Sequence, residues 1–79
     1  MRKVLQEKPW KPLSIEHKGK QRDAEFYVES GIVYVQIATT DGWESASPTQ
    51  VGADASFTAR MLAREAFERA ENQGILMVD

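Results

Sequence analysis

A complete β-hairpin can be read between residues 24 and 37, and it limits what the chain can fold into. Apolar and polar residues alternate on both sides of Ser30-Gly31, a dipeptide typical of a two-residue turn. This turn pairs apolar residues across the strands: Ala24 with Ile37, Phe26 with Val35 and Val28 with Val33. A shift by one residue would turn the glutamates toward the apolar face, so the pattern also fixes the register.

The opposite face of the hairpin carries aromatic and acidic side chains. Its members are Glu25, Tyr27, Glu29, Ile32, Tyr34 and Gln36. Tyrosines form large, rigid contacts in interfaces, but antiparallel sheets also pair aromatic residues across strands on their solvent side. Both interpretations of Tyr27 and Tyr34 stay open at this point.

Two further strands are predicted around the hairpin. Leu13–His17 alternates like a strand, and residues 18–21 would form a four-residue turn that places Ile15 opposite Ala24 and Leu13 opposite Phe26. A turn at Thr39–Gly42 precedes a weaker edge strand, residues 43–47. A loop of two or four residues would place Trp43 on the Tyr34 face, whereas a loop of three residues would place it on the core face.

The period of the apolar residues changes from two to 3.6 after Gly52. Asp54 or Ser56 is expected to cap a helix that runs to about Gln73 and ends before Gly74. One stripe of this helix is apolar and rich in alanine: Ala59, Leu62, Ala63, Ala66, Phe67 and Ala70. Phe57 and Met61 lie outside the stripe, where they either cover a neighbouring segment or form an exposed pair.

These elements predict an α+β fold. We expect an antiparallel β-meander of three to four strands, followed by one long C-terminal helix packed on one sheet face. Residues 1–12 would form a basic arm containing proline and tryptophan, and residues 13–79 a single domain. Trp10, between two prolines, is expected to clip the arm to the edge of the core.

The composition predicts a small cytoplasmic protein. The 79 residues contain no cysteine, which excludes disulfides and thiolate chemistry. No apolar stretch long enough for a membrane span is present, and residues 1–8 lack the apolar segment of a signal peptide. We therefore expect no membrane association.

Catalytic motifs are missing from the sequence. His17 is the only histidine, and we expect it to be a solvated turn residue. The serines lie in no nucleophile motif, and the isolated glycines form no phosphate-binding loop. We expect no enzyme activity, no metal site and no cofactor.

The charge is divided unevenly along the chain. Residues 1–22 contain seven basic and two acidic residues, a net charge of +5, whereas residues 23–79 contain three basic and ten acidic residues, a net charge of −7. Binding of nucleic acid or another polyanion is therefore an alternative function. The candidate residues are Arg2, Lys3, Lys8, Lys11, Lys18, Lys20 and Arg22.

Protein–protein association is the function that the sequence favours. The partner would be a second copy of the chain or another protein, held by the aromatic sheet face and the apolar C-terminal tail. A strand of the partner could also add to a free sheet edge, at residues 13–17 or 43–47. The predicted interface residues are Tyr27, Ile32, Tyr34, Trp43, Ile75, Leu76, Met77 and Val78.

Overall fold

The computed structural model describes residues 8–52 and 54–76, which form five strands followed by one helix. The elements are β1 (Lys11–His17), β2 (Lys20–Glu29), β3 (Ile32–Thr39), β4 (Gly42–Ser45), β5 (Thr49–Gln50) and α1 (Ala55–Asn72). The antiparallel sheet has the order β1-β2-β3-β4, and β5 pairs with the part of β3 that β4 leaves free. The predicted α+β fold is confirmed, and β5 is a short strand in addition to the predicted ones.

Both turns of the β1-β2-β3 meander place two residues at positive φ. The angles are 55° at Ser30 and 78° at Gly31, and 54° at Lys18 and 83° at Gly19. Two consecutive positive φ angles characterise the type I′ turn, whose twist matches that of the flanking strands. The predicted register of the β2–β3 hairpin is confirmed, with Tyr27 opposite Tyr34.

The predicted register of the first hairpin is wrong. The turn contains only Lys18-Gly19, so His17 pairs with Lys20 and Leu13 lies opposite Ala24. The pairing is thus shifted by two residues from the prediction. Because side chains alternate with a period of two, this shift leaves the same residues facing the helix.

The beginning of α1 is fixed by side-chain hydrogen bonds. The Asp54 carboxylate accepts a hydrogen bond from the backbone N–H of Ser56 at 2.9 Å, so Asp54 is the N-cap. The hydroxyl of Thr58 accepts a hydrogen bond from the backbone N–H of Gly52 at 3.2 Å. These bonds join the first turn of the helix to the connector before it.

The end of α1 is joined to the sheet. The N–H of Gly74, at φ 75°, donates to the carbonyl of Glu71, and the N–H of Ile75 donates to that of Ala70. This pair of bonds is the Schellman motif. The carbonyl of Ile75 then accepts a hydrogen bond from the backbone N–H of Thr40 at 2.9 Å, which ties the helix end to the β3–β4 turn.

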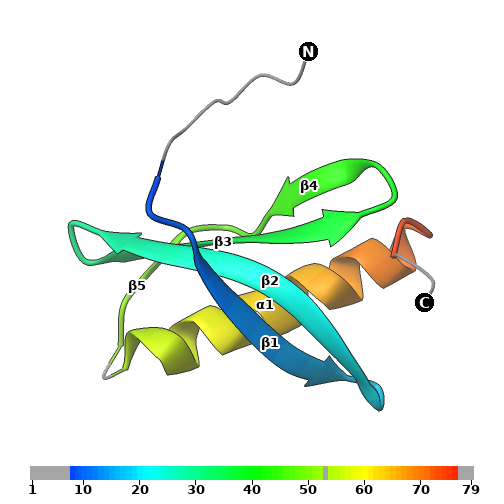
Figure 1. Ribbon diagram of the computed structural model, residues 1–79, viewed down its shortest axis with the longest axis horizontal. Helices are drawn as coiled ribbons and strands as arrows, with labels where there is room; N and C mark the ends of the chain where they lie inside the picture. The colour runs from blue at the N-terminus through cyan, green and yellow to red at the C-terminus, as the bar shows by residue number, and fades with distance from the viewer. Residues whose placement is uncertain (1–7, 53, 77–79) are drawn as a thin grey trace.

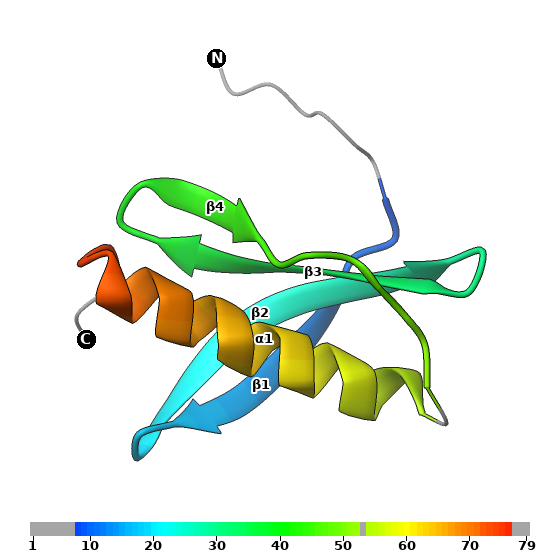
Figure 2. The ribbon, with the colours of Figure 1, turned by 180° about the vertical axis from the view of Figure 1, so that it is seen from behind.

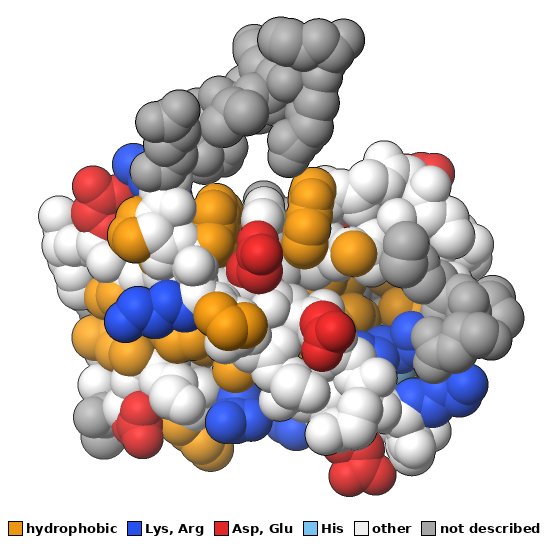
Figure 3. Space-filling view, viewed as in Figure 1, with side chains coloured by type: hydrophobic (Ala, Val, Ile, Leu, Met, Phe, Trp, Pro, Cys, Tyr) orange, Lys and Arg blue, Asp and Glu red, His pale blue; other side chains and the backbone are white. Residues whose placement is uncertain are grey.

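The molecule has two layers. From behind, α1 runs diagonally across the sheet, packed mainly against β3 and β1 (Figure 2). The other face of the sheet, toward the viewer in Figure 1, is covered by no further helix of the described chain. This surface is called the open face below, and Figure 3 shows its side chains.

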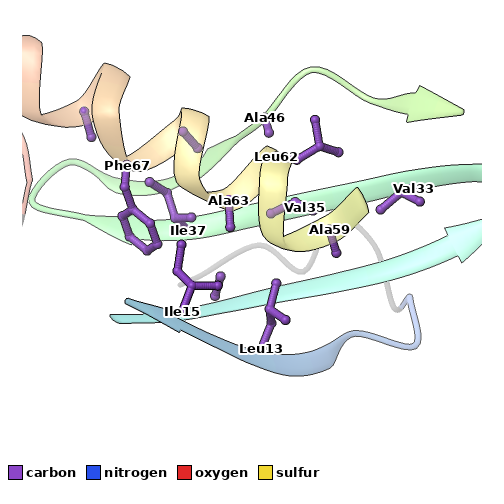
Figure 4. Packing of buried hydrophobic residues seen from close by; sticks show 13 residues of the cluster. Leu13, Ile15, Val33, Val35, Ile37, Ala46, Ala59, Leu62, Ala63 and Phe67 are labelled. Atoms are coloured by element: carbon purple, nitrogen blue, oxygen red, sulfur yellow. The ribbon is translucent and has the colours of Figure 1, made fainter. Parts of the chain in front are cut away.

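The core lies between α1 and the sheet. All members of the predicted alanine-rich stripe are buried, and the small side chains bring the helix axis close to the strands. Phe67 and Ile37 point into the space between the two layers, and Ile15 lies beneath them (Figure 4). Packed interiors contain few voids, and here these large side chains occupy the space beside the small alanine side chains.

Some apolar residues remain outside this core. Val28 faces the helix side but is 41% exposed, because β1 begins opposite Phe26 and leaves the end of the hairpin uncovered. Phe57 and Met61 form an exposed apolar pair on α1, the second of the two predicted arrangements.

The free edge of β1 is unsuited to strand addition. Pro12 lacks a backbone N–H, and the carbonyl of Ser14 accepts a hydrogen bond from the guanidinium of Arg60 at 3.1 Å. A partner strand therefore meets one missing donor and one occupied acceptor there.

We expect Ser30→Asn to stabilise the fold by up to about 1 kcal/mol, because asparagine tolerates positive φ better than serine does. The measurement is the urea concentration at the midpoint of unfolding, and the slope of the unfolding free energy against urea concentration should not change. Ser30→Val is the matched control and should lower the midpoint, since a β-branched residue is strained at this φ. Equal midpoints for the two variants would contradict the role given to this turn.

Candidate functional site

The open face is acidic. Strand pairing assigns to it every second residue of each strand: Pro12, Ser14, Glu16, Gln21, Asp23, Glu25, Tyr27, Glu29, Ile32, Tyr34, Gln36, Ala38, Trp43, Ser45 and Gln50. Four of these residues carry carboxylates, and none of these strand positions holds lysine or arginine. Hydrophobic and acidic side chains are interspersed over the middle of this face (Figure 3).

Aromatic stacking covers one end of the open face. Trp10 lies edge-on to Tyr27, with ring centroids 4.7 Å apart, and Tyr27 stacks on Tyr34 at the same distance. Tyr27 is consequently only 8% exposed. The predicted clip by Trp10 is thus made to the open face, not to the edge of the core, and it removes most of Tyr27 from the candidate interface.

Lys8 extends this cluster with a positive charge. Its Nζ lies 5.7 Å from the centroid of the Tyr27 ring and 3.3 Å from Oε1 of Glu29. The hydrogen bond and the attraction of Glu29 raise the pKa of Lys8 above its ordinary value. An aromatic ring and a carboxylate together therefore hold a cation at this end of the face.

A groove lies at the other end, next to Trp43. The turn before β4 contains two residues, Thr40 and Asp41, which places Trp43 opposite Ala38 on the open face. Trp43 is 50% exposed. The groove has a volume of about 470 Å³, and the open-face residues that line it are Pro12, Ser14, Asp23, Glu25, Ala38 and Trp43. We call it the Trp43 groove.

The carboxylates of the Trp43 groove differ in their surroundings. Glu25 is half-buried and its Oε1 accepts a hydrogen bond from Nε2 of Gln36 at 2.8 Å, which limits its rotamers. Asp23 is exposed. A hydrogen-bonded carboxylate and an exposed carboxylate beside an indole ring form a site for hydrogen-bond donors and cations.

The remaining predicted interface residues lie away from this groove. Ile32 and Tyr34 are half-buried on the open face. Ile75 and Leu76 are half-buried against the core, at the β3–β4 turn, where the hydrogen bond to Thr40 holds them. Met77 and Val78 lie outside the described residues.

The basic residues are distributed along β1 and β2. Lys8 precedes β1 and is paired with Glu29, whereas Lys18 follows β1 and is paired with Glu71 at 3.0 Å. Lys11 is exposed, and Lys20 and Arg22 belong to the helix-facing side of β2. Arg2 and Lys3 lie outside the described residues. Anion binding by this set stays a prediction.

The predicted solvent exposure of His17 is wrong. The alternation of β1 places it on the helix side together with Leu13 and Ile15, and there it is 5% exposed and lies against Phe67, with ring centroids 6.0 Å apart. Its Nε2 is hydrogen-bonded to Oε1 of Glu71 at 3.2 Å, and the same oxygen contacts Lys18. Glu71 is 54 residues away in sequence, so no local pattern could indicate this contact.

Neither Asp23 nor Glu25 is among the predicted interface residues. The alternation of β2 carries the signal, because it places both residues on the Tyr27 face. Their assembly with Trp43 depends on the length of the β3–β4 loop, which the sequence left open.

Other kinds of site find no support in the described residues. No three of their His, Asp or Glu side chains are placed to hold a metal ion. No helix in residues 8–52 and 54–76 combines the length and the apolar character that a membrane span requires. No protein-family model, curated protein or solved structure matches this chain. Evidence on function therefore comes from its own surface.

The two tryptophans should differ in what they contribute to stability. We expect Trp10→Ala to cost about 2 kcal/mol, because it uncovers Tyr27, and Trp43→Ala to change stability by less than about 0.5 kcal/mol. Urea unfolding of both variants makes this comparison. A larger loss for Trp43→Ala would mean that this ring supports the fold.

We expect acid to remove the contribution of Glu71. Hydrogen bonds from Lys18 and then His17 lower its pKa below the usual 4.5. The stabilisation is thus complete above pH 4.5 and is lost as the pH falls through the folded-state pKa. Glu71→Gln should lower the urea midpoint at pH 7 and lower it less at pH 3, where the carboxyl of the wild-type chain is more protonated. Equal losses at both values would contradict this role of the carboxylate.

Proposed function

We propose that this chain is a non-catalytic protein-binding module and that the open face is its contact surface. The observation that carries the proposal is Trp43, a large ring left half-exposed beside a groove on the face that α1 does not cover. Tryptophan is enriched among residues that dominate binding energy in interfaces, above all where it is packed beside a pocket.

The surroundings of Trp43 support this proposal. The aromatic cluster at the other end of the face is already packed, so that part of the contact surface is rigid. Rigid surfaces lose little conformational entropy when a partner binds. Ile75 and Leu76, which belong to the predicted tail, are half-buried against the core, so the proposal rests on the open face.

Site-specific photocrosslinking tests the proposal. We expect a benzoylphenylalanine at position 43 to give a discrete protein adduct in an extract of the native cells. A product of twice the chain mass would indicate self-association, and another mass a different partner. The matched control carries the probe at position 68, on the exposed side of α1. The same products from both positions, or none from position 43, would contradict the proposal.

A further inference from the structure

The charge of the open face restricts what can bind there. Its carboxylates belong to Glu16, Asp23, Glu25 and Glu29, and only Glu29 is paired with a described lysine, Lys8. Two of the others, Asp23 and Glu25, line the Trp43 groove, and none of the described lysines or arginines lines it. A ligand seated there meets a local negative potential, which favours positive groups and opposes phosphates and acidic peptides.

The chain itself shows how this face holds a cation. Lys8 lies over the ring of Tyr27 and bonds Glu29, so one aromatic ring and one carboxylate share a single ammonium group. The Trp43 groove repeats this combination with a larger ring and two carboxylates. The difference is that no side chain of the described residues supplies the cation.

We infer that the Trp43 groove binds an arginine side chain of a protein partner. This inference rests on the proposed function and names the chemistry of the partner. The planar guanidinium stacks on an indole better than an ammonium group does, and it bonds carboxylates in a bidentate manner. Glu25, held by Gln36, is the fixed acceptor, and Asp23 is the adjustable one. Ala38 and Pro12 line the path of the aliphatic part of the side chain.

A peptide titration followed by NMR tests the inference. The probe is an acetylated, amidated Gly-Arg repeat of six residues, and its twin carries citrulline, which is neutral and nearly isosteric, in place of arginine. We expect the arginine peptide to shift the Trp43 indole N–H and the amides of Asp23 and Glu25. The affinity should fall as salt is added, and the citrulline peptide should cause no such shifts.

A pair of charge-matched variants locates the contact. Asp23→Asn with Glu25→Gln should weaken binding of the arginine peptide about tenfold or more, because both charged acceptors are lost. Glu65→Gln with Glu68→Gln removes the same charge from the exposed side of α1 and should leave the affinity unchanged. Equal losses for the two pairs would mean that net charge, and not this groove, determines binding.

Failure of this inference can be distinguished from failure of the proposed function. If the adduct at position 43 forms equally well in the Asp23→Asn, Glu25→Gln variant, the open face binds protein without arginine and the inference is wrong. It is also wrong if the citrulline peptide binds as well as the arginine peptide. Groove shifts caused by a single-stranded oligonucleotide, with none from the arginine peptide, would overturn it as well.

Discussion

The packing of a single helix on a five-stranded sheet determines the rest of this structure. The alanine-rich side of α1 lies close to β3 and β1, and the apolar faces of the strands are buried by this contact. Residues 8–52 and 54–76 form only this one helix, and it covers one face of the sheet, so no second helix of these residues covers the other face. The open face is thus a result of the element order, in which one helix follows the strands.

The open face compensates for the missing layer in part. Trp10 and the stacked tyrosines act as a small second core outside the sheet, and Lys8 closes it with an ion pair. This cluster ends before Trp43, where Asp23 and Glu25 replace further aromatic residues. The face is therefore divided into a part that supports the fold and a part that is available for binding, and only the second part carries the proposed function.

The sequence predicts local structure well where one pattern controls it. The alternation around Ser30-Gly31 fixes the β2–β3 register, and the 3.6-residue period of residues 59–70 gives the buried side of α1. It fails where two turns fit the same residues, as at Lys18-Gly19, and where the β3–β4 loop length decides the side of Trp43. Contacts such as that of His17 with Glu71 depend on how the helix packs on the sheet. The two residues are 54 positions apart in sequence, so no local pattern relates them.

The hydrogen bond from Arg60 to the carbonyl of Ser14 has a consequence for assembly. A sheet with two free edges can add strands on both sides and grow into an open filament. Here Pro12 and Arg60 close one side, and among the described strands this leaves the short edge made by β4 and β5. Edge-to-edge pairing of two copies through that remaining side uses up both available edges. Such a pair would be finite, because neither copy would keep a free edge for a third.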